Sequence, residues 1–329
     1  MELRQYAGLA VSMHREWNRK KSLLRLLAGL LFLVEIGPLA ADPIRPAPSE
    51  TDHVPAFILE LPESVNEVLI ADTGNATLHR FANDGEKVSW HDERYMSIGL
   101  NGIRKQKAWD KKTPLGTYFI TERLDTTRLH DKYGAAAFPL DYPNAWDRYN
   151  SRTGSGIWLH GVDRHHPQRP PLDTEGCLAL QNDALLQLAD TLEPLVTPVI
   201  VAPEMKWAST AEIEETRLEF RIAIDQWRQS LSDGDLLAYL ALYSDDFRYR
   251  DMDKADWSAY RLQTFEARHL QRIEISGLLL LADPAEPELY LSRFTQVLAT
   301  DDNVIETTKR LYWRRTADRR WQILSEDSG

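Results

Sequence analysis

Short runs of alternating apolar and polar residues, separated by turn residues, fill residues 57–205. Alternation predicts β-strands, because successive side chains of a strand point to opposite faces of the sheet. An Asp-Thr-Gly-Asn turn at 72–75 lies between two such runs and predicts a β-hairpin. Apolar residues at helical spacing predict one helix over 182–192, with Asn182 or Asp183 as its N-cap. We expect strands at 65–71, 77–81, 88–90, 95–99, 116–121, 156–160 and 199–202.

Residues 210–329 carry a different pattern from the mostly β part before them. Apolar residues recur at helical spacing among the charges of 212–231, which predicts a long amphipathic helix capped by Thr210. A shorter helix through Tyr243 and another over 257–268 should follow. Long alternating runs then occupy 272–281, 288–299, 304–316 and 320–325. An antiparallel meander that follows helices predicts an α+β domain.

The N-terminal residues predict a targeting signal. An Arg-Lys-Lys run precedes the apolar stretch 26–34, which is shorter than the ~20 apolar residues of a membrane-spanning helix. Small residues before Ala41 predict a cleavage site. We therefore expect residues 1–41 to be a signal peptide and the mature protein to be periplasmic, without a stable membrane span. An uncleaved anchor is the alternative, because Arg25 interrupts the apolar stretch, and Met13 is an alternative start.

Composition and charge narrow the class of protein. The 329 residues include 43% hydrophobic and 27% charged side chains, which is typical of globular domains. Residues 42–56, rich in proline and polar side chains, predict a linker between the signal peptide and the first domain. The net charge of -11, without a basic stripe, argues against nucleic acid as a partner.

The single cysteine, Cys177, excludes an intrachain disulfide and a zinc site built from several thiolates. Thiol redox work would lack a resolving cysteine inside the chain. Adjacent His165 and His166 have no third ligand at a recognisable spacing, so we predict no metal site. We also expect no cofactor. Among the chemical roles of a cysteine, this leaves that of a nucleophile.

A histidine stands at a suitable place for that chemistry. An apolar run ends at His160, and Cys177 follows after a proline-rich loop. A cysteine attacks a carbonyl as the thiolate, so it needs a neighbouring base, and imidazole is the usual one. Gly176 lets the backbone approach a substrate carbonyl, and the amides of Gly176 and Cys177 are candidates for holding the oxyanion. From spacing alone, a buried structural cysteine beside a structural histidine stays equally open.

The order His160-Gly161, proline-rich loop, and Thr-Glu-Gly before Cys177 resembles the signature of the YkuD-type L,D-transpeptidases. The Lys-Thr-Pro-Leu-Gly-Thr-Tyr segment 112–118 is similar to an upstream element of that family. The resemblance implies a YkuD-like β-sandwich with short helices over residues 57–205. It also implies that Cys177 is the nucleophile, His160 the general base, and Gly161 the residue whose carbonyl orients the imidazole.

Two departures from the family pattern concern substrate binding. Glu175 stands where most members carry a histidine, and the arginine that often follows the cysteine, a carboxylate clamp in the family, is missing. Arg152 is a candidate replacement, with a surface role as the equal alternative. Glu175 either binds a substrate amine or faces solvent. Thr174 and Trp158 complete the predicted substrate-binding residues, and a core role is the alternative for Trp158.

Residues 210–329 resemble the NTF2-like (SnoaL-like) cone fold. No nucleophile, metal cluster or acid-base pair stands out in this domain. We therefore expect it to position peptidoglycan, a protein partner or a second copy of the chain. A YkuD-type domain followed by an NTF2-like one also resembles the L,D-carboxypeptidases of helical bacteria.

The resemblance implies a reaction on peptidoglycan stem peptides. Cys177 should attack the carbonyl between diaminopimelate and the terminal D-alanine of a tetrapeptide stem. Transfer of the acyl group to an amine would give a 3-3 crosslink or attach a protein, which is our first expectation. Transfer to water would give a tripeptide, as in an L,D-carboxypeptidase. A catalytically inert murein-binding scaffold is the third interpretation.

Overall fold

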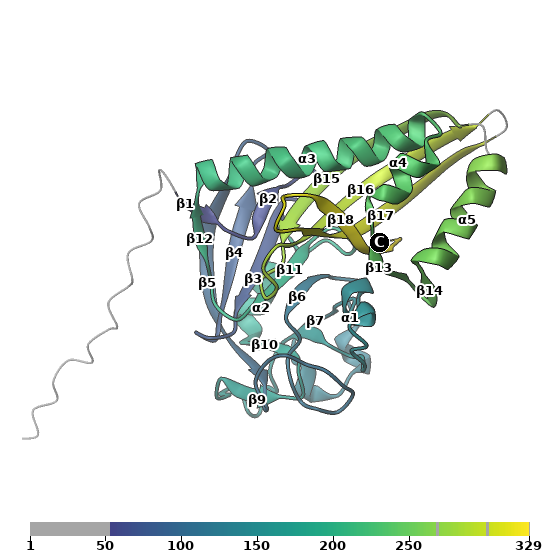
Figure 1. The fold of residues 1–329 in the computed structure, drawn as a ribbon. Coiled ribbons are helices and arrows are strands. Elements are labelled where there is room, and N and C mark those ends of the chain that lie inside the picture. The colour runs from purple at the N-terminus through teal and green to yellow at the C-terminus, as the bar shows by residue number, and fades with distance from the viewer. Residues whose placement is uncertain (1–52, 268–269, 301–302, 329) are drawn as a thin grey trace, which may run out of the picture. The chain divides into compact units, whose positions relative to one another are not determined.

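The first half of the chain builds one sheet of nine strands (Figure 1). The computed structural model describes residues 53–267, 270–300 and 303–328, so the predicted signal peptide and most of the predicted linker lie outside the described residues. The strands follow the order β6-β11-β3-β4-β5-β10-β8-β7, and β9 pairs with β5. They are β3 (Glu67–Asp72), β4 (Thr77–Asn83), β5 (Val88–Gly99), β6 (Gly116–Phe119), β7 (Ala137–Pro139), β8 (Trp158–His160), β9 (Leu172–Thr174), β10 (Leu178–Leu180) and β11 (Pro198–Ala202).

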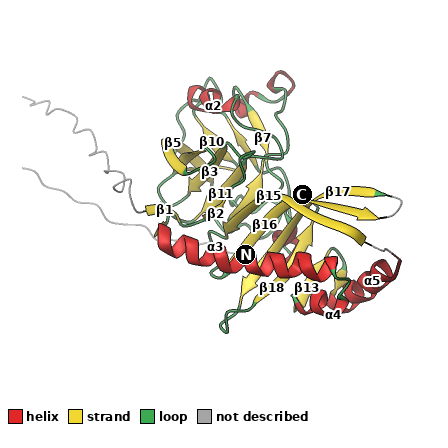
Figure 2. Cartoon of the chain, turned by 90° about the horizontal axis from the view of Figure 1, so that it is seen from above, coloured by secondary structure: helices red, strands yellow, loops and turns green. Residues whose placement is uncertain are grey.

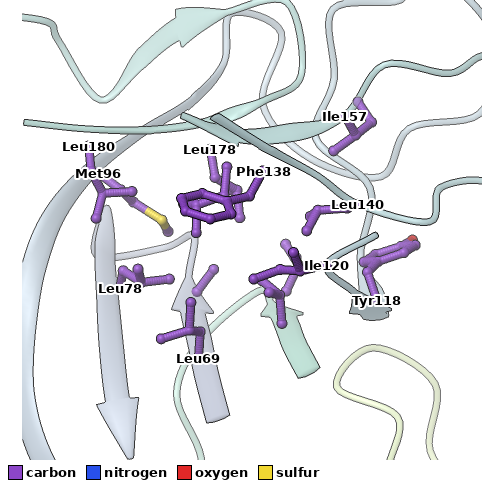
Figure 3. Packing of buried hydrophobic residues seen from close by; sticks show 14 of the residues in the cluster. Leu69, Leu78, Met96, Tyr118, Ile120, Phe138, Leu140, Ile157, Leu178 and Leu180 are labelled. Carbon is purple, nitrogen blue, oxygen red and sulfur yellow. The ribbon is translucent and has the colours of Figure 1, made fainter. Parts of the chain in front are cut away.

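A hydrophobic cluster lies on one face of this sheet. Figure 3 shows Leu69 of β3 and Leu178 of β10 near Phe138 of β7, and all three are fully buried. Helix α2 (Asn182–Ala189) adds Leu188 to the cluster. Each such side chain contributes about 1.5–3 kcal/mol by burial. The strands are otherwise connected by short helices, which are η1 (Thr126–Arg128), η2 (Asp131–Tyr133) and α1 (Ala145–Tyr149).

The second half builds a sheet of seven strands in the order β14-β13-β18-β17-β16-β15-β2. The last four strands of the chain are antiparallel neighbours, as in the predicted meander. Helix α3 (Thr210–Ser232) contacts β15 and lies along the sheet in Figure 2. The other elements are α4 (Leu236–Ala241), β13 (Tyr243–Tyr249), β14 (Met252–Asp253), α5 (Lys254–Ala267), β15 (Leu270–Ala282), β16 (Leu289–Thr300), β17 (Val304–Arg315) and β18 (Trp321–Asp327).

The two sheets share a hydrophobic cluster. Val68 and Ile70 of β3 are fully buried in it. Leu281 of β15, Leu291 of β16 and Leu324 of β18 belong to the same cluster. Since side chains of both sheets fill one apolar interior, all described residues form a single compact unit.

The predicted fold class is confirmed, since a mostly β domain is followed by an α+β domain. Two strand predictions differ from the structure. Residues 88–90 and 95–99 belong to one strand, β5, because the polar residues between them stay paired with β4. The expected helix through Tyr243 ends earlier, and β13 begins there. An irregularity in the pairing of β13 with β18 breaks its alternation, which hides the strand in the sequence.

The segment that joins the domains is ordered by strand pairing and helix capping. Strand β12 (Trp207–Ser209) pairs antiparallel with β1 (His53–Pro55), so the last described residues of the predicted linker form a strand. The cap of α3 lies one residue earlier than expected. Ser209, rather than Thr210, caps this helix, and Glu212 completes the capping box.

Strand β2 (Ile58–Glu60) belongs to the second sheet, although the alternation predicts that residues from 57 onward belong to the first domain. It pairs antiparallel with β15, where Glu60 faces Leu280. A strand of three residues is too short for its alternation to indicate a partner. The beginning of the described chain is therefore tied to the C-terminal domain.

Candidate active site

The pairing of β8 with β10 brings the two predicted reacting residues into one neighbourhood. The strands are parallel neighbours, with Leu159 opposite Leu178 and His160 opposite Ala179. Leu159 and Leu178 are fully buried in the hydrophobic cluster. Cys177 directly precedes β10, and the charges of Lys132 and Arg169 act on the pKa of both Cys177 and His160, so the two residues lie in one neighbourhood.

His160 is held in one orientation by its neighbour. Its Nδ1 lies 2.6 Å from the carbonyl oxygen of Gly161, which can only accept, so Nδ1 carries the proton and Nε2 has the free lone pair. The ring of Tyr133 packs edge-on against the imidazole, 5.2 Å away between centroids. Burial lowers the pKa of His160 to about 4, although the bond to Gly161 opposes this. The imidazole is therefore a neutral base at neutral pH.

The thiol of Cys177 is kept protonated by its surroundings. The residue is 9% exposed, and its Sγ donates to the carbonyl oxygen of Gly156 at 3.4 Å. Burial raises the pKa of the thiol, against a hydrogen bond from the Trp158 backbone and the positive charge of Lys132. The resting pair is thus a neutral thiol and a neutral imidazole. Such a pair forms the thiolate only as the base takes the proton.

The turn before Cys177 depends on glycine. Gly176 has a φ of +125°, and a Cβ there would lie 2.6 Å from the carbonyl oxygen of Lys112. Thr113, from the Thr-Pro element noted in the sequence, donates its hydroxyl to the Gly176 carbonyl at 2.9 Å. The Thr174 hydroxyl donates to the Cys177 carbonyl at 2.7 Å. These bonds fix the backbone that presents the thiol.

The same turn corrects two predictions. The N–H of Gly176, expected to hold an oxyanion, donates to the Thr174 hydroxyl at 3.1 Å. Because the Gly176 amide already has a partner, only the N–H of Cys177 stays a candidate for the oxyanion from the predicted pair of amides. Thr174 is 4% exposed and uses its hydroxyl within the turn, so a direct contact with substrate is not available to it.

Arg152 does not replace the missing arginine in this structure. Its Nη1 lies 3.1 Å from Asp147, which is itself buried, and its Nη2 lies 3.8 Å from Glu286 of the C-terminal domain. The guanidinium is therefore engaged by the protein's own carboxylates. A sequence pattern does not reveal such partners, because both lie outside the segment that suggested the role.

Lys132 is a candidate that the sequence reasoning missed. Its ammonium lies 3.6 Å from the exposed Glu175 carboxylate and 5.0 Å from the centre of the Tyr133 ring. Its charge lowers the pKa of both Cys177 and His160, so it lies close to both groups. Only the fold brings it there from η2. Trp158, half-buried, packs on the same Tyr133 ring at 4.5 Å between centroids.

Asn182 braces the end of β8 instead of capping α2. Its Oδ1 accepts hydrogen bonds from the N–H groups of Ala135 at 2.9 Å and Val162 at 3.2 Å. Its Nδ2 donates to the Val162 carbonyl at 2.8 Å. Neither Asn182 nor Asp183 is the cap, because Gln181 occupies that position without a side-chain bond. A polar side chain at a helix start has thus been used for a tertiary contact.

Neither metal ligation nor membrane spanning finds support within the described ranges. There, no group of three or more His, Cys, Asp or Glu side chains could hold a metal ion. The ring of His166 lies 3.6 Å from its neighbour Asp163. No helix between residues 53 and 328, as far as the structure describes them, is long and apolar enough to cross a membrane.

The C-terminal domain contains a cavity of about 280 Å³ whose wall includes the half-buried cations Arg261 and Lys309. Lys309 lies in its wall, 2.7 Å from the carboxylate of Glu326. The Tyr243 hydroxyl donates to the same carboxylate at 2.9 Å. The guanidinium of Arg261 lies over the Tyr239 ring at 4.8 Å. Charges and aromatic rings line this cavity, as in a binding pocket.

Two family models match separate parts of the chain. Residues 66–201 match the L,D-transpeptidase catalytic domain, YkuD. Residues 219–327 match the Cds6 C-terminal NTF2-like domain. No curated protein matches the sequence. The two models cover the N-terminal and the C-terminal sheet respectively.

Solved structures share the arrangement of both domains. Bd1075 of Bdellovibrio bacteriovorus is 26% identical with a TM-score of 0.70, and the match covers 84% of this chain and 98% of that one. The helical cell shape determining protein Pgp2 of Campylobacter jejuni is 24% identical with a TM-score of 0.67, covering 79% and 91%. A point mutant of Pgp2 is 22% identical with a TM-score of 0.69, and the match covers 83% of this chain and 94% of that one. The chain thus carries a catalytic domain of the YkuD L,D-transpeptidase family, whose function concerns peptidoglycan, followed by an NTF2-like domain.

Proposed function

We propose that the protein is a periplasmic L,D-transpeptidase that uses Cys177 to cleave the diaminopimelate–D-alanine bond of tetrapeptide stems. The observation that carries this proposal is the pairing of β8 with β10, because His160 ends the one strand and Cys177 directly precedes the other. The hydrogen bond that fixes the His160 ring supports a base role, because it leaves Nε2 free to accept a proton.

In the first half of the reaction, Nε2 of His160 takes the proton of the Cys177 thiol. The sulfur attacks the carbonyl carbon of the stem, and the N–H of Cys177 is the donor we assign to the resulting oxyanion. The carbon–nitrogen bond then breaks. D-alanine leaves as the amine after taking the proton back from His160, and the stem remains as a thioester on the sulfur.

The second half decides between two products. An amine of another stem or of a protein attacks the thioester, with His160 again as base, and gives a crosslink or an attachment. The exposed carboxylate of Glu175 at the site would attract such an amine. Water as acceptor gives a tripeptide, and this carboxypeptidase outcome is favoured by the pairing of Glu175 with Lys132, which leaves less negative charge for an ammonium.

We assign recognition of the terminal carboxylate to Lys132. The family arginine is missing, and Arg152 is engaged by the buried Asp147. Two cations act on the pKa of both reacting groups, Arg169 and Lys132. Arg169 is held by Asp173 at 2.6 Å, whereas Lys132 has only a looser contact of 3.6 Å with the exposed Glu175. An ammonium contacts a carboxylate without the two-pronged geometry of arginine. This recognition should therefore be weaker and more tolerant of the shape of the leaving residue.

The deciding experiment incubates residues 42–329 with tetrapeptide muropeptides and identifies the products by mass spectrometry. Crosslinked dimers with free D-alanine would support transpeptidation. Tripeptide with D-alanine and no dimer would replace it by carboxypeptidation. Absence of D-alanine would leave the third interpretation, an inert murein-binding scaffold. The Cys177→Ala variant serves as the blank in each reaction.

A further inference from the structure

A cleft of about 450 Å³ lies between helix α1 of the N-terminal domain and strands β13 and β18 of the C-terminal domain. Both domains supply its walls, and Figure 1 shows α1 beside these strands near the C-terminus. The volume suits a short peptide or a sugar. Four arginines and two tyrosines dominate the lining, namely Arg148, Arg248, Arg250, Arg310, Tyr149 and Tyr249.

Two of the arginines hold the domains together. Arg310 is 8% exposed and forms ion pairs with Asp141 of the first domain and Asp327 of β18. Arg148 of α1 reaches Asp327 at 3.1 Å. The carboxylates of Asp141 and Asp327 are therefore neutralised by arginines already in place. Asp141 and Asp327 therefore do not pair with the other two arginines of the cleft, Arg248 and Arg250.

The other two arginines are available to a ligand. Arg248 and Arg250 are exposed, and neither has an ion-pair partner among the residues that the structure describes. The guanidinium of Arg250 lies 5.3 Å from the centre of the Tyr249 ring, a contact that leaves its N–H groups free to donate. Burial raises the pKa of the Tyr149 hydroxyl, the exposed Asp246 adds to this rise, and Arg314 and Arg248 oppose it, so Arg248 lies near this hydroxyl. The side chains thus converge on the cleft from both domains.

Glu326, a third carboxylate of the cleft, is also satisfied. It contacts Lys309 at 2.7 Å and accepts the Tyr243 hydroxyl at 2.9 Å. The charged lining residues that have no ion-pair partner among the described residues, Arg248 and Arg250, are therefore positive, although the whole chain has a net charge of -11. Such a local reversal of sign favours an anionic ligand.

We propose that this cleft binds a carboxylate-bearing peptide stem of peptidoglycan, apart from the stem that is cleaved. Arg248 and Arg250 provide guanidinium groups that match carboxylates, and the tyrosines provide flat surfaces for the rest of the strand. This inference rests on the proposed function for the identity of the ligand. A stem bound here would contact both domains and hold the enzyme on the wall during and after cleavage.

The test uses the Cys177→Ala chain and a photoreactive tripeptide muropeptide, which lacks the bond to be cleaved. Crosslinking should label the peptides that carry Tyr149 or Tyr249, as mapped by mass spectrometry. Arg248→Ala/Arg250→Ala should weaken binding at this site about tenfold and remove the label. The matched control, Arg319→Ala/Arg320→Ala, removes the same charge from the turn between β17 and β18 and should keep both.

Two further ligands and a single variant show which part of the ligand is recognised and guard against misfolding of the double variant. The free tripeptide should bind and the disaccharide without peptide should not, because the carboxylates carry recognition. A single Arg250→Gln variant, with its thermal unfolding checked, keeps the test valid if the double variant misfolds. Unchanged labelling in the double variant, or equal loss in the control, would overturn the inference. Loss of labelling in the double variant, together with no D-alanine release by the chain that keeps Cys177, would reject the proposed function and leave the cleft as a binding site.

Discussion

Burial acts in the same direction on the bases of the two domains, but their net pKa shifts are opposite in sign. In the N-terminal domain, burial lowers the pKa of His160 and raises that of Cys177, so both groups are neutral. In the C-terminal cavity, burial would lower the pKa of Lys309, but the negative charge of Glu326 and other partners outweighs it and raises that pKa. The difference is the partner: the first pair touches backbone groups, and Lys309 touches a carboxylate.

The difference in charge state distinguishes a site suited to proton transfer from a site suited to binding an anion. A group that must accept or release a proton near neutral pH cannot be fixed in one charge state by a strong ion pair. A group that attracts an anion benefits from a permanent charge. Burial without a charged partner thus leaves His160 and Cys177 neutral, whereas the ion pair with Glu326 keeps Lys309 charged.

The largest effect should come from the thiol. Cys177→Ala should lower D-alanine release by at least about a thousandfold, because the proposed reaction forms its thioester on the Cys177 sulfur. Thermal unfolding should change little, because only one small side chain is lost. Release is measured by mass spectrometry of tetrapeptide muropeptides, and a variant that kept its turnover would show that the chemistry lies elsewhere.

The base should be nearly as important. His160→Asn should cost about a hundredfold to ten-thousandfold in kcat, the usual range for a general base. In the unchanged protein, the rate should fall as pH drops through about 4, where His160 becomes protonated in the folded state. A pH profile of kcat/KM checks this, and an acid limb near pH 6.5 would contradict a buried neutral base.

The same shift has a consequence for stability. The unfolded histidine titrates near its ordinary value of 6.5, whereas the folded one does so at about 4. The unfolded state therefore binds more protons between these values, and stability should fall as pH decreases from 6.5 to 4. Urea unfolding of the wild type and of His160→Asn over this range should show a pH slope that the variant lacks.

The ion pair of the C-terminal cavity should give a smaller effect. Glu326→Gln should reduce the free energy of unfolding by about 2 kcal/mol, below the value for a fully buried pair because Lys309 is 22% exposed. The double variant Glu326→Gln/Lys309→Met should recover part of the loss, since no unpaired charge remains. Urea denaturation measures both, and a double variant less stable than the single one would contradict this account.

The smallest effect should come from Lys132, the proposed partner of the substrate carboxylate. Lys132→Ala should raise KM about fivefold with little change in kcat, because an exposed ion pair with a substrate carboxylate contributes about 1 kcal/mol. Lys132→Arg should restore KM, whereas a purely structural lysine would affect kcat and stability together. Steady-state kinetics on soluble tetrapeptide distinguishes the two outcomes.

The sequence predicted the sheets better than the surroundings of the candidate pair. His160 and Cys177 stand in a short, ordered motif, and their strands are adjacent, so local spacing carried the information. Lys132 and Asp147 reach the neighbourhood through tertiary packing, which no periodicity records. The backbone amide of Gly176 was misassigned because the Thr174 hydroxyl competes for it, and such competition depends on geometry alone.

The place of β2 in the second sheet imposes an order on folding. Its partner β15 lies near the other end of the chain, as the pairing of Glu60 with Leu280 shows. During synthesis, β2 emerges early and must wait for most of the polypeptide before its hydrogen bonds can form. A long-range pairing of this kind closes late and slowly. A C-terminal fragment beginning at α3 would leave the edge of β15 open, ready to recruit another chain and aggregate.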